Sequence, residues 1–297
     1  MYETILIPTG GSDHAIRAAE HGHYLARRFD ATVHVINVVD VQAAAGAFSA
    51  GGVGEEFIGR LETEGENTIE AVEAAIGETD SLQTTTVRGK PGEAILEYAD
   101  GHDADLLAMG THGRTGINRY IAGSVTERVV RLADCPVLTV RATDRSRVTE
   151  DYDEILIPTD GSEPAAAAVE HGLAIAAQTG ARVHAVNIVD IGDIAASPEY
   201  TPPTAVIEQL ESEGEAATER IATQAQDRDL DAVTAVREGL PARDILEYAD
   251  DADIDLIAMG TAGRTGLNRY LLGSTAERIV RHAEMPVVAV NARDRVR

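Results

Sequence analysis

The stretch GTHGRTGINRYIAGS at residues 110–124 recurs as GTAGRTGLNRYLLGS at residues 260–274, and 11 of the 15 residues are identical. A second pair keeps the same offset of 150 residues, because YETILIPTGGS at 2–12 matches YDEILIPTDGS at 152–162. No insertion separates the two copies in register. The 297-residue chain is therefore expected to contain two copies of one domain in tandem.

A polar, charged stretch stands between the copies. It predicts a first domain at residues 1–142, a linker at 143–151 and a second domain at 152–297. Two further stretches, 41–54 and 191–206, have no stable periodicity. We expect both of them to be mobile loops that follow the second strand of each domain.

Within each copy, short apolar runs alternate with stretches whose apolar residues recur at helical spacing. In the first copy the runs are found at 4–8, 32–38, 82–87, 105–110 and 136–140. Strands that alternate with helices and that are apolar on both faces predict a parallel sheet covered on both sides. Each copy is thus expected to be a doubly wound α/β domain with five strands and four helices.

The charge of the chain excludes several partners. It carries 50 acidic and 25 basic residues, a formal net charge of −25. Nucleic acid and anionic membranes are poor partners for such a chain. Self-repulsion is screened at molar ionic strength, where the Debye length is about 3 Å, so the acidic composition favours a halophilic origin over the alternative of an ordinary acidic protein. No apolar run is long enough to span a membrane and the N-terminus lacks a signal peptide pattern, so we expect a cytoplasmic protein.

The repeated stretch is expected to bind an anion. It follows the fourth strand, where ligands of open α/β sheets bind, and its glycines remove side chains where the backbone turns or approaches a ligand. Ser124 with Glu127, and Ser274 with Glu277, have the spacing of a capping box and predict a helix start. The free amides and the dipole at a helix start suit a phosphate group. Arg114 or Arg264 either neutralises that phosphate or is a solvated surface residue.

The spacing G-x2-G-x9-G-S in both copies resembles the nucleotide-binding motif of the universal stress protein (UspA) family. PTDGS after the first strand of the second copy, a valine that ends the second strand and the closing CPVLTV of the first copy are similar to that family as well. The likeness covers nearly all of each copy and identifies the chain as a tandem, ATP-binding member. It implies a Rossmann-like fold of the adenine nucleotide alpha hydrolase-like kind. It also implies that the last strands, 136–140 and 286–290, pair to form an intramolecular pseudo-dimer, with further homo-oligomers open.

The resemblance also implies the site residues. In the second copy they border the adenine, ribose and phosphates at Pro158, Thr159, Asp160, Ile188, Gly260, Gly263, Gly273, Ser274 and Thr275. In the first copy the matching positions are Pro8, Thr9, Gly10, Val38, Gly110, Gly113, Gly123, Ser124 and Val125. One position departs from the family pattern, because Gly10 replaces the aspartate that the second copy keeps as Asp160. We therefore expect two sites of unequal affinity.

A dedicated nucleotidase is not what these residues predict. The chain lacks the P-loop sequence GxxxxGK[ST]. No acidic residue lies within either repeated stretch, so Mg2+ is expected only as a companion of the nucleotide. His21 and His23 are two residues apart on a helix, so they point apart and predict no metal site. The favoured function is a stress-response binding module for ATP, ADP or AMP that acts on an unknown protein partner. A slow ATPase or phosphoryl-transfer enzyme, and a protein that keeps the fold without using its pockets, remain alternatives.

Overall fold

The computed structural model describes residues 1–41, 55–77, 79, 81–112, 123–148, 151–190, 204–263 and 272–291. These residues form two compact units, one up to Val148 and the other from Asp151 onward. The predicted loops at 41–54 and 191–206 fall almost entirely outside the described ranges. Residues 204–206 are an exception, because they belong to a helix.

The first unit alternates strands and helices along its length. Its elements are β1 (Thr4–Pro8), α1 (Asp13–Phe29), β2 (Thr32–Val39), α3 (Glu55–Ile76), β3 (Leu82–Arg88), α4 (Pro91–Gly101), β4 (Leu106–Gly110), α5 (Ser124–Leu132) and β5 (Val137–Val140). The strands pair in parallel in the order β3-β2-β1-β4-β5. The chain therefore winds in one direction from β1 to β3 and in the other from β4 to β5, and the order reverses between β1 and β4.

The second unit repeats this arrangement. Its elements are β6 (Glu154–Pro158), α6 (Glu163–Thr179), β7 (Arg182–Asp190), α8 (Thr204–Gln226), β8 (Ala232–Gly239), α9 (Pro241–Asp251), β9 (Leu256–Gly260), α10 (Ser274–His282) and β10 (Val287–Val290). Its strands are also parallel, in the order β10-β9-β6-β7-β8. The predicted doubly wound α/β fold with two repeated domains is confirmed.

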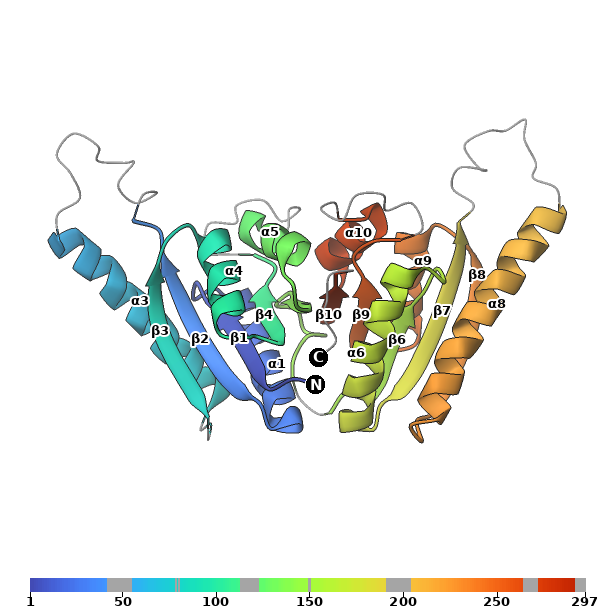
Figure 1. Ribbon diagram of the computed structural model, residues 1–297, viewed down its shortest axis with the longest axis horizontal. Coiled ribbons are helices and arrows are strands. Elements are labelled where there is room, and N and C mark those ends of the chain that lie inside the picture. Colours follow the sequence, from blue (N-terminus) through green and yellow to red (C-terminus); the bar gives the residue numbers. More distant parts are fainter. Residues whose placement is uncertain are drawn as a thin grey trace, which may run out of the picture. The chain divides into compact units, whose positions relative to one another are not determined.

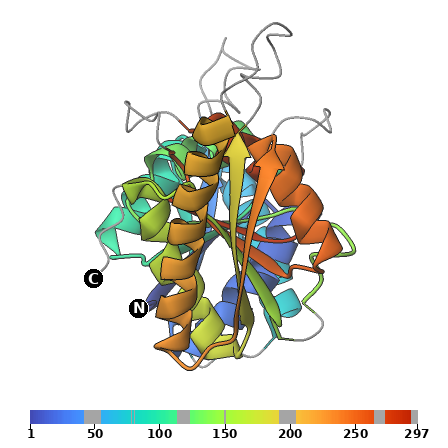
Figure 2. The same cartoon turned by 90° about the vertical axis from the view of Figure 1, so that its right-hand side faces the viewer.

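Helices cover both faces of each sheet (Figure 1). In the first unit α1 packs against α3 on one face, and α4 packs against α5 on the other. In the second unit the long helix α8 lies along β7 and β8 (Figure 2). Because both faces are covered, strand residues such as Ile5, Leu6 and Ile7 are buried without alternation.

Part of the predicted linker packs against the first unit. Ser146 is fully buried, and its hydroxyl donates to the carbonyl oxygen of Arg141 at 2.5 Å. Nε2 of His21, on α1, donates to the carbonyl oxygen of Ser146 at 2.7 Å. Because burial disfavours the charged imidazole, desolvation lowers the pKa of His21 to about 4 and the ring stays neutral. His21 thus fixes the exit of the chain from β5.

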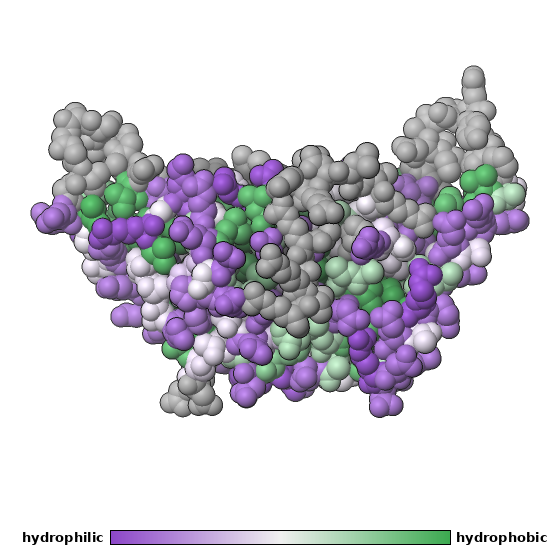
Figure 3. Space-filling view, in the orientation of Figure 1, coloured by the Kyte–Doolittle hydropathy of each residue, from purple (hydrophilic) through white to green (hydrophobic). Residues whose placement is uncertain are grey.

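The described surface is mostly hydrophilic (Figure 3). On the face drawn in Figure 3, hydrophilic residues cover most of the described surface, and apolar residues form small patches. Within the described ranges no helix is long and apolar enough to cross a membrane.

Candidate functional site

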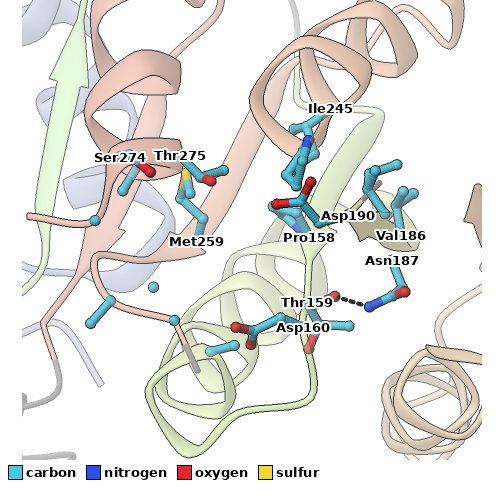
Figure 4. Close-up of a pocket in the computed structure, with 18 of the residues that line it drawn as sticks. Pro158, Thr159, Asp160, Val186, Asn187, Asp190, Ile245, Met259, Ser274 and Thr275 are labelled. Carbon is cyan, nitrogen blue, oxygen red and sulfur yellow. Dashed lines mark hydrogen bonds between the residues drawn. The ribbon is translucent and has the colours of Figure 1, made fainter. Parts of the chain in front are cut away.

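A cavity of about 410 Å³ lies at the carboxyl ends of β6, β7 and β9 in the second unit. This is the edge of the sheet where the strand order reverses between β6 and β9, which is where open α/β sheets bind ligands. The cavity is closed on other sides by α8, α9 and the start of α10 (Figure 4). The fold therefore forms a concave site at the position that the sequence predicted for a ligand.

The cavity brings together all the described residues that were predicted for the second site. They are Pro158, Thr159, Asp160, Ile188, Gly260, Gly263, Gly273, Ser274 and Thr275. The tenth predicted residue, Arg264, lies outside the described residues. Strand ends and a helix start that are separated by more than a hundred residues in the chain thus line one space.

The first unit places its predicted residues at the same ends of its elements. Pro8 ends β1, Thr9 and Gly10 follow it, Val38 is near the end of β2, and Gly110 ends β4. Gly123, Ser124 and Val125 stand at the start of α5. Gly113 and Arg114 lie outside the described residues.

The cavity wall combines apolar and oxygen-bearing side chains. Val186, Ile245 and Met259 contribute apolar surface, whereas Asp160, Asp190, Ser274 and Thr275 contribute oxygen atoms (Figure 4). Such a mixed lining suits a ligand that has both apolar and polar groups. Within the described ranges, no group of three or more His, Cys, Asp or Glu side chains is placed to hold a metal ion.

The start of α10 differs from the predicted capping box, and that prediction was wrong. Gly273, not Ser274, is the N-cap, and no side chain caps the helix; Gly123 has the same role before Ser124 in α5. The shift arises because the amide of Gly273 donates to the carbonyl oxygen of Thr261 at 2.8 Å, which fixes the backbone one residue earlier. The amides of Ser274 and Thr275 consequently have no partner among the described backbone and side-chain groups. A helix start of this kind offers donors and a positive dipole end to the cavity.

Asp160 is the one carboxylate among the predicted residues. Its Oδ1 accepts from the amide of Ser162 at 3.0 Å, which orients the side chain at the start of α6. Its Oδ2 approaches Gly263 so closely that a Cβ there would lie 2.8 Å from it. In the first unit the position is Gly10, and a Cβ added there would meet no described atom within 4 Å. The described residues therefore leave space for a Cβ at this position.

Asn187 is a site residue that the sequence reasoning missed. It lines the cavity from β7, and its Nδ2 donates to the carbonyl oxygen of Thr159 at 2.7 Å (Figure 4). Asn37 makes the same bond to Thr9 in the first unit at 2.8 Å. Each asparagine thus holds the segment between β6 and α6, or between β1 and α1, against the sheet. The available signal was an asparagine at the same place in two otherwise apolar strands.

Comparison with known proteins identifies the family. The model of the universal stress protein family matches residues 1–141 and again residues 151–291. The chain belongs to the universal stress protein family. Both matches span a whole α/β unit, so the tandem form is confirmed as well.

Relatives cover one unit or both. A universal stress protein of Methanocaldococcus jannaschii is 39% identical over 139 residues, which are 47% of this chain and 82% of that protein. One of Mycolicibacterium smegmatis is 29% identical over 95% of this chain and 94% of its own. The crystal structure of a universal stress protein from Archaeoglobus fulgidus shares the fold with a TM-score of 0.69, at 20% identity over 97% of this chain and 96% of that one. A further universal stress protein, 26% identical over 48% of this chain and 98% of its own with a TM-score of 0.34, was crystallised in complex with cAMP.

Proposed function

We propose that this universal stress protein binds adenine nucleotide, with ATP as the principal ligand, in each unit. Occupancy of the two sites would regulate its binding to a protein partner in a cytoplasmic stress response. The protein is then a nucleotide-dependent binding module, and Mg2+ would arrive with the nucleotide.

One observation carries the proposal most directly. The amides of Ser274 and Thr275 at the start of α10 have no partner among the described groups, and both residues line a cavity that also has apolar side chains. Phosphate groups are bound at helix starts by such amides and by the helix dipole. The apolar side chains of the same cavity suit a purine base.

The two sites should differ in affinity. The second unit offers Asp160 to a ribose hydroxyl, whereas Gly10 offers the first unit no side chain. A hydrogen bond to a charged group is worth about 1.5–3 kcal/mol and a neutral one about 0.5–1.5 kcal/mol, so this contact alone should favour the second site several-fold or more. The helix starts at Gly123 and Gly273 are alike in lacking a side-chain cap, so without the carboxylate binding at the first site should be weakened and not abolished.

A pair of substitutions at one position tests the proposed phosphate contact. Ser274 is the first residue of α10, and Gly273 before it has φ −64° and ψ 145°, the extended backbone that a following proline requires. Ser274→Pro therefore removes one amide donor at little cost to the helix, whereas Ser274→Ala removes only the hydroxyl. Loss of one charge-assisted bond should weaken ATP binding about tenfold or more.

Isothermal titration with ATP, ADP, AMP and cAMP measures the result. Ser274→Pro should bind ATP at the second site about tenfold more weakly than Ser274→Ala, because both lose the hydroxyl and only the proline loses the amide N–H. Equal affinity of both variants for ATP would show that the helix start does not hold phosphate. Absence of binding of any of the four nucleotides at millimolar concentration would overturn the proposal as a whole. Phosphate release followed over hours in the same samples separates a binding module from a slow ATPase.

A further inference from the structure

Four histidines of the first unit, His14, His23, His102 and His112, have no counterpart in the second, and two of them lie close together. His14 is in the first turn of α1, and His112 follows β4 by two residues. The equivalent residues of the second unit, 150 positions later, are Pro164 and Ala262. Ala262 lines the cavity of the second unit. His112 therefore occupies a position that corresponds to the wall of the ligand site.

Close packing brings the two imidazoles together. A Cβ on Gly110 would lie 2.5 Å from the carbonyl carbon of His14, so the end of β4 abuts the first turn of α1 directly. The hydroxyl of Ser12 donates to the carbonyl oxygen of His112 at 2.9 Å and fixes the backbone after β4. The ring centroids of His14 and His112 are 5.0 Å apart, with the planes tilted by 41°.

The hydrogen bonds of His14 fix its tautomer. Its Nδ1 accepts from the amide of Ala142 at 2.9 Å. Since Nδ1 accepts, the neutral ring carries its proton on Nε2. Burial lowers the pKa of His14, and the neighbouring His112 and Arg141 lower it further, so the ring is neutral near pH 7. Nε2 of His14 is consequently an N–H donor.

His112 has the same tautomer for a different reason. Its Nδ1 lies 3.0 Å from the hydroxyl oxygen of Thr111, which is itself buried. If Nδ1 carried the proton, the buried hydroxyl hydrogen of Thr111 would have no acceptor among the described groups. With the proton on Nε2, both Nδ1 and the hydroxyl are satisfied. Burial, followed by Arg141, lowers the pKa of His112, so this ring is neutral as well.

This arrangement leaves one polar atom without a partner among the described residues. Nε2 of His112 is shielded from solvent and makes no hydrogen bond to any of them. A shielded donor of this kind is costly to leave unpaired, and an anionic acceptor removes that cost. Two neutral imidazole N–H groups at one place suit an acceptor with several oxygens, such as a phosphate group.

We propose that His14 and His112 form a phosphate subsite that the first unit alone possesses and that binds the outer phosphate groups of its nucleotide. The inference rests on the proposed nucleotide binding. The first unit then selects for the length of the phosphate chain, whereas the second unit selects mainly through Asp160. ATP should exceed AMP in affinity by a larger factor in the first unit than in the second.

Site-resolved NMR titration tests the subsite. The ring C–H signals of the two histidines, assigned from His14→Ala and His112→Ala, report on the first unit, and EDTA removes adventitious metal ions. His112→Ala installs the residue that the second unit already carries, so the backbone should tolerate it. In His112→Ala, the ratio of ATP to AMP affinity in the first unit should fall about tenfold. The amide signals of Gly110 and Gly123 report binding in this variant. His102→Ala is the matched control, because His102 is an exposed histidine at the far end of α4, and it should leave the ratio unchanged.

A transplant gives the reciprocal measurement. Pro164→His together with Ala262→His should raise the ATP to AMP ratio of the second unit severalfold. An unchanged ratio in His112→Ala and in the transplant, with both nucleotides still binding, would overturn the subsite and leave nucleotide binding intact. If neither nucleotide shifts the histidine signals or the amide signals of Gly110 and Gly123, the proposed function itself fails for the first unit.

Discussion

The contact between Asn187 and Gly214 provides the sharpest test of how the site is held. Asn187 is 5% exposed, and its Nδ2 bonds to the carbonyl oxygen of Thr159 while its Oδ1 faces α8. A Cβ added to Gly214 of α8 would overlap that Oδ1. The asparagine is therefore the main obstacle to a side chain at Gly214, since the next side chain, Val236, would lie 3.3 Å away. This predicts that substitutions at the two positions are strongly coupled.

The magnitudes follow from the contacts. Asn187→Ala removes one hydrogen bond and leaves a partly buried carbonyl unpaired, a loss of about 2 kcal/mol. Gly214→Ala costs about 2 kcal/mol through the overlap and regains about 1 kcal/mol in helix propensity, a net loss of about 1 kcal/mol. In the double variant the overlap disappears and the helix gain remains, so the expected net loss is about 1 kcal/mol. Additive behaviour would give about 3 kcal/mol, so the coupling energy is about 2 kcal/mol.

The coupling energy is measured by urea unfolding of the unchanged protein, the two single variants and the double variant. Hydrogen exchange of the β7 amides reports the stability of the second unit separately from that of the first. The first unit contains the matched pair, because a Cβ on Gly65 would lie 2.6 Å from Oδ1 of Asn37. The same cycle there should give a coupling of similar size. Free energies that add within about 0.5 kcal/mol in both units would refute the reasoning. We also expect Asn187→Ala to weaken nucleotide binding in the second unit and not in the first, because Thr159 and Asp160 lose their anchor.

Three further predictions concern affinity, pH and salt. Gly10→Asp should strengthen nucleotide binding in the first unit several-fold, and Asp160→Gly should weaken it in the second unit by a similar factor. If calorimetry shows that neither substitution changes the affinity, the proposed contact between the carboxylate and the ribose is wrong. Burial lowers the pKa of His21 from 6.5 to about 4, so between these values the unfolded chain binds a proton that the folded one does not. As the pH drops through that window, the free energy of unfolding should therefore fall by up to about 1.4 kcal/mol per pH unit. The control is His21→Gln, which keeps a donor for Ser146 but cannot take up a proton. If the two proteins lose stability in parallel as the pH drops, His21 is not the cause. With a net charge of −25, the midpoint of thermal unfolding should rise between low and molar KCl, and equal midpoints would contradict the halophilic interpretation.

The sequence predicted the central strands well because they are buried on both faces. A run such as TILIP becomes β1 with almost every side chain in the core, so an unbroken apolar run is a direct signal of it. The position of the glycine stretch between a strand and a helix then placed the ligand site at one edge of each sheet. Both predictions use only local sequence and the rules of parallel sheets.

The rest of the site depends on contacts between distant residues. Asn187 matters because its side chain donates a hydrogen bond to the carbonyl oxygen of Thr159, 28 positions earlier in the chain. No local sequence pattern predicts this bond. The capping box failed for a related reason. Ser274 and Glu277 have the right spacing, but the bond from Gly273 to Thr261 fixes the backbone so that the glycine becomes the cap.

The differences between the two units fall on side chains and not on main-chain donors. Both helix starts, at Gly123 and Gly273, lack a side-chain cap, so each unit keeps the feature that suits a phosphate group. The exchange of Gly10 for Asp160, and of His112 for Ala262, changes which other part of a ligand is contacted. If both units bind nucleotide as proposed, the two copies share the helix start that binds phosphate and differ in the side chains that determine selectivity. An affinity averaged over the whole chain would then describe neither site.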